Sequence, residues 1–473
     1  MLYVLGNNTR TRFSCIFTLI NTEGFMLKIN KFLILLLMTA GQVFNCQATD
    51  VLPAIGDPYG IVRARKGFVQ DILGTTEATF AGLAKETQHA RLEAMQARGF
   101  HYGNFTISSL NELRAAYQTQ KDTHDEDTAG SFYVIVGNDP MHNPLVYQQV
   151  DTGSLQAHWG KACQQGGKRL TVMVASNSNG LETLGYQDVP TNITRYIHDH
   201  TQGPAASISA APGTLLRNYF AFHGDETPGK AHLPWRQNGD QQLNFLEEIL
   251  DIVNADHHIN IPVSNGYLAF RTPDLAARIV NAPLLNAIAA TFEAHRGAIQ
   301  VGIHTDVTVS HGLCEGDNHR FLNDPEQRAL INQIFCAGLD LGQGTNPNTP
   351  ATRRIAKVLL ETQVEATLRA AYINNSDIVV LSMLGCGAFG NEPEWLIHAV
   401  ELCQELIEES GMRVVLNLFS GNNVVDNDGL KTRLLDLIAA TDGAWLEYSE
   451  EEGALVVKNM STAEPVLKRV RRA

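Results

Sequence analysis

The sequence lacks the features that mark nucleic-acid-binding, disulfide-linked and membrane-spanning proteins. Its 36 Lys and Arg face 50 Asp and Glu, and the formal net charge of −14 argues against a nucleic-acid backbone as the main partner, because such binding needs clustered positive charge. The 7 cysteines are scattered and form neither a disulfide framework nor a Cys-x-x-Cys metal site. The apolar run at residues 32–38 is too short for a permanent transmembrane helix.

Two common phosphate-binding motifs are missing from the glycine-rich segment at residues 384–391. The segment lacks the Gly-Lys-Ser/Thr ending of a nucleoside triphosphatase loop, so it has no lysine for a γ-phosphate and no hydroxyl placed for magnesium. Its second half departs from the Gly-x-Gly-x-x-Gly fingerprint of dinucleotide-binding enzymes, and no acidic residue follows at the end of the next strand. These absences favour a diphosphate ligand without triphosphate or hydride-transfer chemistry.

The sequence does have enough apolar material for a large core. The chain has 473 residues, of which 44% are hydrophobic and 18% are charged. This composition predicts a soluble globular protein with one large domain or two ordinary ones. No internal repeat and no low-complexity linker divides the sequence.

The N-terminal region has the layout of a secretory signal peptide. Lys28 and Lys31 precede the apolar run at 32–38, and small or polar residues follow up to Ala48. We therefore predict a cleaved signal-like segment at residues 26–48, with Met26 as the true start; a buried helix is the alternative. The segment predicts a protein that is exported from a bacterium or delivered into a host cell.

Apolar runs that favour strands alternate with amphipathic segments that favour helices. This alternation predicts an α/β fold in which a mostly parallel sheet is covered by helices on both faces, with the ligand outside the carboxyl ends of the strands. Residues 51–164 are expected to form an N-terminal helical layer and the first strand, and residues 165–460 the α/β/α core. We predict strands at 131–136, 170–175, 266–271, 299–305, 378–384 and 412–419, and helices at 67–98, 109–120, 325–339, 352–372 and 394–410.

The segment at residues 378–395 is the strongest candidate site. It combines a buried strand, a glycine-rich turn, Asn391 as a helix N-cap and Pro393 in the first helical turn. Backbone amides and a helix N-terminus would converge there, which is a geometry that binds phosphate. The alternative is an ordinary strand-to-helix turn whose glycines only relieve steric crowding. If the loop binds phosphate, Val at Gly387 or Gly390 should weaken ligand binding.

Residues 384–391, together with Trp395, resemble the second phosphate loop of macrodomains. The likeness is greatest to the microbial poly(ADP-ribose) glycohydrolase type and to the group around the Legionella effector MavL. Segments at 201–220, 265–267 and 301–336 follow the order of that group, so the resemblance spans about residues 170–418. It implies a three-layer macrodomain-like core and an ADP-ribosyl hydrolase that binds ADP-ribose, needs no cofactor and removes ADP-ribose from a modified protein. Ubiquitin would be that protein if the likeness extends to the substrate.

The resemblance implies that two loops and the first turn of a helix hold the ligand. Asn177, Asn179 and Gln202 would hydrogen-bond adenine or ribose, and Phe389 would cover the diphosphate or ribose; isolated amide side chains in turns more often satisfy the backbone. The full set of predicted ligand-binding residues is Asn177, Asn179, Gln202, Gly203, Gly385, Cys386, Gly387, Ala388, Phe389, Gly390 and Asn391.

The sequence also departs from that family. Residues 174–180 lack the glycine triplet of a typical first loop, and residues 201–204 stand where poly(ADP-ribose) glycohydrolases have tandem glutamates. These departures disfavour polymer cleavage and favour a monomeric ADP-ribose substrate.

Hydrolysis of a glycosidic bond needs carboxylates that stabilise developing positive charge and accept a proton. Asp306 is the first candidate, because it ends an apolar strand in a polar stretch on the expected ligand side. Glu315, Asp317 and Asp324 follow it and could supply a second carboxylate. The alternative is that these residues are solvated loop positions, and helix capping is the favoured interpretation for Asp324.

His304, His311 and His319 lie among these acids, so a metal site is a further interpretation. Their spacing matches no standard helical metal-binding pair, and the chain has 16 histidines. Three hypotheses remain: an ADP-ribosyl hydrolase, a reader that binds ADP-ribose without turnover, and a metal-dependent hydrolase of another phosphate-containing substrate.

Overall fold

The computed structural model describes most of the chain, and all described residues belong to one compact unit, Leu52–Ala473. The signal-like segment at 26–48 lies outside the described residues, as does Asp317. Among the helices that the structure describes, none is long and apolar enough to cross a membrane. The described residues are 61–64, 67–122, 129–137, 152–183, 185–199, 201–223, 235–270, 275, 282–315, 318–419, 424–449 and 454–458.

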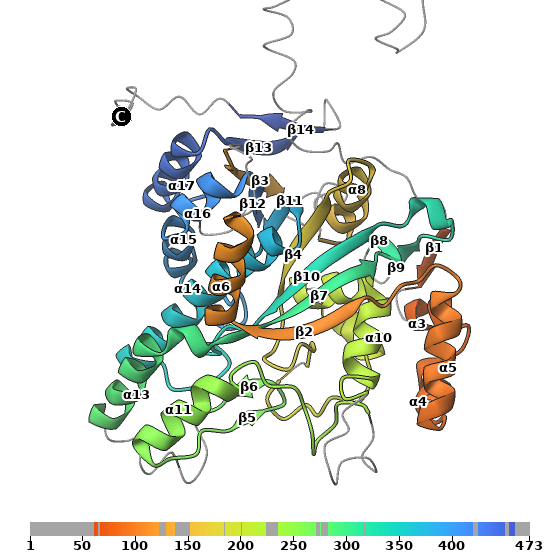
Figure 1. The fold of residues 1–473 in the computed structure, drawn as a ribbon, viewed down its shortest axis with the longest axis horizontal. Coiled ribbons are helices and arrows are strands. Elements are labelled where there is room, and N and C mark those ends of the chain that lie inside the picture. The colour runs from red at the N-terminus through yellow and green to blue at the C-terminus, as the bar shows by residue number, and fades with distance from the viewer. Residues whose placement is uncertain are drawn as a thin grey trace, which may run out of the picture. The chain divides into compact units, whose positions relative to one another are not determined.

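The centre of the fold is a nine-stranded mixed sheet (Figure 1). Neighbouring strands from β13 to β10 run parallel. At one edge β14 pairs antiparallel with β13; at the other, β7 pairs antiparallel with β10, and β2 pairs antiparallel with β7. The prediction of an α/β fold with a mostly parallel sheet is therefore confirmed. In spatial order the strands are β14 (Ala454–Val457), β13 (Ala444–Ser449), β3 (Ser131–Gly137), β12 (Arg413–Phe419), β11 (Ser376–Leu381), β4 (Arg169–Ala175), β10 (Leu330–Cys336), β7 (Gln300–Thr308) and β2 (Asn104–Ser109).

The central strands are buried on both faces, and alternate residues pack against different helices. On β10, Ile334 and Cys336 join the core beneath one helical layer, whereas Phe335 joins a smaller cluster on the opposite face with Ala206. On β4, Met173 and Val174 divide in the same way. This arrangement explains why the strands are nearly continuous apolar runs in the sequence.

Two helical layers enclose the sheet (Figure 1). The first contains α6 (Leu110–Lys121), α14 (Pro350–Ile373), α15 (Pro393–Glu401), α16 (Gln404–Ser410) and α17 (Asp428–Ala440). The second contains α8 (Thr152–Gln165), α9 (Gln202–Ser209) and α10 (Ala211–Tyr219). Beside β7, α13 (Ala282–Ala294) and α11 (Glu247–His257) pack on the amino-terminal half of α14. The layers position the loops that follow β4 and β11 at one edge of the sheet.

The predicted N-terminal helical layer is formed by three short helices and not by one long helix. They are α3 (Phe68–Leu73), α4 (Glu77–Ala81) and α5 (Lys85–Gln96), and they pack on α10. Buried Glu77 accepts hydrogen bonds from the Ile193 amide, the Thr194 amide and the Tyr219 hydroxyl. This carboxylate thus ties the layer to η2 (Thr194–His198) and α10.

The helix predicted at 325–339 is wrong, because the structure has a short turn followed by β10 there. The turn is η4 (Pro325–Gln327), capped by the Asp324 carboxylate, which accepts from the Glu326 amide at 2.9 Å. The polar pair Asn332–Gln333 interrupts the apolar run and gives it a helix-like pattern. Gln333 is nevertheless fully buried in the strand, where it donates to Gln156 and to the Ala206 carbonyl.

The strand predicted at 266–271 is reduced to β6 (Tyr267–Leu268), which pairs with β5 (Val263–Ser264) outside the main sheet. Three further strands, β1 (Ile61–Ala64), β9 (Asn318–Phe321) and β8 (His311–Glu315), form a small antiparallel sheet. Glu315 is the last residue of β8.

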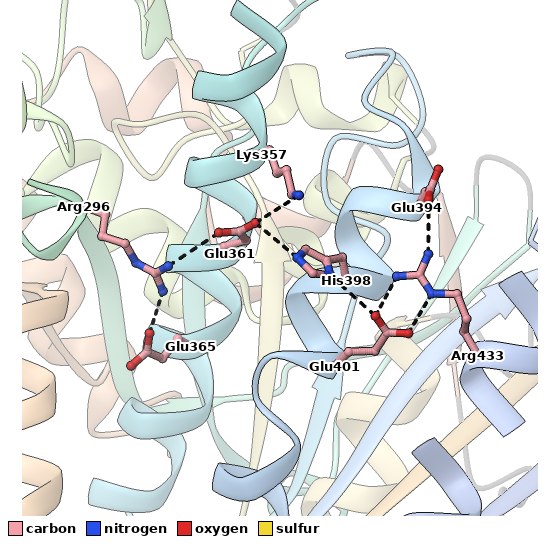
Figure 2. Close-up of polar contacts among 8 residues, drawn as sticks. All are labelled: Arg296, Lys357, Glu361, Glu365, Glu394, His398, Glu401 and Arg433. Atoms are coloured by element: carbon pink, nitrogen blue, oxygen red, sulfur yellow. Dashed lines mark hydrogen bonds and ion pairs between the residues drawn. The ribbon is translucent and has the colours of Figure 1, made fainter. Parts of the chain in front are cut away.

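Charged side chains tie α14 to its neighbours (Figure 2). Arg296, in η3 (Arg296–Ala298), bridges Glu361 at 3.5 Å and Glu365 at 2.9 Å. On the other side, Arg433 of α17 forms a two-bond pair with Glu401 of α15, at 2.7 and 2.6 Å. The second pair joins α15 to α17, and His398 of α15 lies 3.9 Å from Glu361 of α14, so α15 is held between these two helices.

Glu365 is the most strongly paired carboxylate of this network. Burial would raise its pKa, but hydrogen bonds from Arg114 and Arg369 outweigh burial and lower the pKa of Glu365 from 4.5 to about 2. Its contribution to stability is therefore present above pH 4.5 and lost as the pH falls through about 2.

We expect Glu365→Gln to lower the free energy of unfolding by about 3 kcal/mol at pH 7, with the difference from wild type narrowing below pH 4.5. Urea titrations between pH 3 and pH 7 measure both effects. Glu394→Gln is the matched control, since its exposed side chain pairs with Arg433 at 3.4 Å and with no other cation among the described residues, and should contribute little. An equal loss at all pH values would contradict the assignment.

Candidate functional site

A cavity of about 350 Å³ opens at the carboxyl ends of the parallel strands. Residues that follow β4 and β11 contribute to its wall, as do Asn417 within β12 and the start of α9. The lining includes Ser176, Asn177, Glu182, Thr183, Asp199, Thr201, Gln202, Tyr267, Ser382, Asn417 and residues 385–389. Within the described residues, no Lys or Arg lines it. An anionic ligand would therefore be bound by neutral donors.

The glycine-rich loop supplies those donors from its backbone. Gly385 and Gly390 have φ angles of 71° and 65°, and the turn closes through hydrogen bonds from the Gly390 amide to the Gly387 carbonyl and from Asn391 to Gly385. Gly387, Ala388 and Phe389 line the cavity, and their backbone amides donate to no acceptor in the part of the chain that the structure describes. Three consecutive free amides make an anion-binding concavity.

The predicted role of a helix N-terminus in this loop is not supported. Helix α15 begins at Pro393 with Glu392, and not Asn391, as its N-cap. Asn391 is buried, and its side-chain amide donates to the Leu339 carbonyl at 2.7 Å. Neither Asn391 nor Gly390 lines the cavity, and Gly390 packs against Gly342. The loop, and not the helix, forms the candidate phosphate site.

The predicted amide side chains already make hydrogen bonds within the protein. Asn177 lines the cavity, but its Nδ2 donates to Thr183 Oγ1 at 2.7 Å. Asn179 is fully buried away from the cavity, where its Oδ1 accepts from the Leu181 amide. Gln202 accepts from the Ala175 amide and donates to the Met173 carbonyl, so its side chain extends the hydrogen bonding of β4. Asn179 does not line the cavity, whereas Asn177 and Gln202 do, so their contact with a ligand stays a prediction.

Gly203 does not line the cavity either, but it makes room for a carboxyl group that the sequence analysis missed. A Cβ at this position would collide with the Ala175 carbonyl and with Oε2 of Glu182. Glu182 lines the cavity, and its side chain lies beside the start of α9. The position of Glu182, in the polar loop after β4, was a usable signal, because ligands bind where such strands end.

Glu182 is 7% exposed, and Ser207 Oγ donates to its Oε1 at 3.2 Å. Burial raises the pKa of Glu182 from 4.5 to about 8, partly offset by buried Arg217 and reinforced by Asp199. At neutral pH the side chain is therefore mainly a neutral carboxylic acid that can donate a proton. Asp199 lines the same cavity and accepts from the Thr201 amide at 2.8 Å.

This raised pKa predicts a pH-dependent effect of Glu182→Gln on stability. The folded protein retains a proton that the unfolded chain releases, so wild-type stability falls as the pH rises from 4.5 to about 8. Gln does not titrate, so the variant should match wild type near pH 4.5 and exceed its free energy of unfolding by up to about 5 kcal/mol above pH 8. Denaturant titrations at several pH values measure this; exposed Glu86→Gln should follow wild type throughout.

Asp306 is at the wrong edge of the sheet for the catalytic role that the sequence predicted. Strand β7 runs antiparallel to β10, so its carboxyl end points away from the cavity. The Asp306 amide donates to Asn332 near the start of β10, and its carboxylate pairs with Arg169 at the start of β4. The error arose because a sequence pattern does not give strand direction.

The other predicted acids are not gathered at the cavity. Asp324 caps η4 and does not line the cavity, Glu315 is the last residue of β8, and Asp317 lies outside the described residues. His304 is fully buried between Arg217 and the Tyr102 carbonyl, and buried His311 lies 3.5 Å from Asp71. Among the described residues, no group of three or more His, Cys, Asp or Glu could hold a metal ion.

Two further features complete the cavity. Phe389 lines it, and the centre of its ring is 5.5 Å from the centre of the Tyr267 ring. The Tyr267 hydroxyl donates to the Thr183 carbonyl. Ser382 is 5% exposed, lines the cavity and has a hydroxyl without a hydrogen-bond partner among the described residues. A buried hydroxyl of this kind is costly unless a ligand or water satisfies it.

No family model matches the chain, and no curated protein matches it at a significant level. Solved structures of bacterial poly(ADP-ribose) glycohydrolases show a distant structural similarity. The apo enzyme from Deinococcus radiodurans has 8% identity and a TM-score of 0.33, over 73% of this chain and 96% of that chain. The enzyme from Thermomonospora curvata has 10% identity and a TM-score of 0.32, over 71% and 85%. The D. radiodurans enzyme in complex with ADP-ribose has 10% identity and a TM-score of 0.32, over 73% and 95%.

Proposed function

We propose that the cavity binds ADP-ribose and that the protein removes ADP-ribose from a modified protein by hydrolysis. The observation that carries this proposal is the meeting, in one cavity, of three free backbone amides and a buried carboxylic acid. The amides suit a diphosphate, and the acid suits a glycosidic leaving group. ADP-ribose attached to a protein contains both a diphosphate and a glycosidic bond, and ADP-ribose is the ligand implied by the sequence resemblance of residues 384–391.

In this proposal the diphosphate binds the amides of residues 387–389 and the distal ribose points toward Glu182. The bond between C1 of that ribose and the protein side chain breaks as Glu182 gives its proton to the leaving atom. Water then bonds to the oxocarbenium-like C1 and gives a proton to the Asp199 carboxylate. Transfer of that proton through solvent restores Glu182. The products are free ADP-ribose and the unmodified protein.

A reader that binds ADP-ribose without turnover is the second candidate. It is favoured by the position of Asp306 and by the hydrogen bond that already occupies Asp199, since both leave fewer carboxylates for chemistry. A monomeric ADP-ribose substrate, ubiquitin as the modified protein and export through residues 26–48 also belong to the proposal.

Calorimetry with free ADP-ribose, followed by a release assay on mono-ADP-ribosylated protein with and without chelator, tests these functions. We expect binding, and release that the chelator leaves unchanged. Absence of binding to the folded protein would overturn both the hydrolase and the reader. Binding without release would identify a reader, and release abolished by chelator would favour a metal-dependent hydrolase.

A further inference from the structure

A fully buried arginine lies behind the cavity wall. Arg217 of α10 is 0% exposed, and its guanidinium carbon is 3.7 Å from the centre of the Phe335 ring. Its Nε donates to the Gly180 carbonyl at 3.0 Å, and its terminal nitrogens lie 2.8 Å from His304 Nδ1 and 3.1 Å from Thr214 Oγ1. A buried cation is costly unless it is paired and hydrogen-bonded. The groups that surround Arg217 therefore indicate why a cation is buried at this position.

The histidine beside Arg217 is an acceptor and not a second cation. His304 Nε2 lies 2.6 Å from the Tyr102 carbonyl, an acceptor, so the ring proton is on Nε2 and the Nδ1 atom accepts from Arg217. Burial, reinforced by Arg217, holds the pKa of His304 well below its usual value. Burial also lowers the pKa of Arg217, to about 10, which leaves it charged at neutral pH.

Two contacts connect this cation to Glu182. The Gly180 carbonyl that accepts from Arg217 lies two residues before Glu182 in the same loop. On the other side, Arg217 lies 3.5 Å from Ser207 Oγ, the hydroxyl that donates to Glu182 Oε1 at 3.2 Å. Arg217 thus contacts both the backbone that carries Glu182 and the side chain that hydrogen-bonds it.

We infer that Arg217 is a positioning residue for Glu182: it holds Gly180 and Ser207 in place and stabilises the carboxylate that forms when Glu182 gives up its proton. This inference rests on the proposed function of the cavity. The other titratable groups that act on or near Glu182 are Asp199 before α9, Tyr196 of η2 and Tyr267 of β6. None of these three is a cation, so Arg217 supplies the positive charge that compensates the negative charge of the Glu182 carboxylate.

Three variants separate this role from a general effect on packing. Arg217→Met removes the charge and keeps an unbranched side chain, and Ser207→Ala removes only the bridging hydroxyl. Arg328→Met is the matched control: Arg328 is also buried, donates to the Leu322 and Asn323 carbonyls and lies 3.7 Å from the Phe100 ring, but it has no contact with Glu182.

The first readout is the protonation of Glu182, followed as a carboxyl infrared band that is present in wild type and missing in Glu182→Gln. We expect the midpoint of its loss to move upward by about one pH unit in Arg217→Met and in Ser207→Ala, because both weaken support for the carboxylate. Arg328→Met should leave it unchanged. The basic limb of the pH profile of ADP-ribose release should move in parallel.

These readouts separate the inference from the proposed function. Unchanged midpoints in folded Arg217→Met and Ser207→Ala would overturn the role of Arg217, whatever the protein hydrolyses. If Arg217→Met does not fold, an unchanged midpoint in Ser207→Ala has the same force. Shifted midpoints in a protein that releases no ADP-ribose would support the positioning role and overturn the hydrolase.

Discussion

Glu182→Gln is expected to lower the rate of ADP-ribose release roughly 10²–10⁴-fold, the range that a positioned general acid contributes. Gln keeps the shape of the side chain and can still accept from Ser207, but it has no proton to give the leaving atom. Binding of free ADP-ribose should change little, since the amides of residues 387–389 are untouched. A release assay under single-turnover conditions, with calorimetry on the same variant, measures both quantities.

Asp306→Asn is the control for this prediction. Asp306 pairs with Arg169 at the opposite edge of the sheet, so its replacement should leave release unchanged. Asp199→Asn, in contrast, should slow release, because Asp199 lines the cavity and is the proposed acceptor of the water proton. Full release by Glu182→Gln would remove Glu182 from the mechanism. Loss of release in Asp306→Asn alone would restore the assignment that the sequence suggested.

The central sheet was predictable because its parallel strands are buried on both faces. Strands β3, β4 and β12 coincide closely with the apolar runs at 131–136, 170–175 and 412–419, whereas β11 overlaps the run at 378–384 only at residues 378–381. Prediction failed at β10, where buried Gln333 gives a polar interruption that only tertiary hydrogen bonds explain. It also failed for the direction of β7, which depends on the strand beside it.

The part of the candidate site that the backbone forms was predictable from the sequence. The part that depends on the burial of a side chain was not. The loop at 385–389 could be found from a strand followed by glycines, because that pattern constrains the backbone directly. Glu182 resembles any solvated loop carboxylate in the sequence; its raised pKa comes from the burial produced by packing of its loop against α9. Similarly, only the fold shows that the Gln202 side chain hydrogen-bonds the backbone of β4.

Gly387→Val is expected to weaken ADP-ribose binding roughly 10- to 100-fold, equivalent to losing a charge-assisted hydrogen bond at the diphosphate. A Cβ on Gly387 meets no atom within 4 Å, and its φ is not left-handed, so the variant should fold normally with its new side chain obstructing approach to the amides.

Gly390→Val is a poor test, because that residue has a φ of 65° and its Cβ would lie 3.1 Å from Gly342. Gly185→Val, equally free of contacts but away from the cavity lining, is the matched control. Calorimetry with thermal denaturation measures both properties; unchanged affinity in folded Gly387→Val would mean that these amides do not hold the ligand.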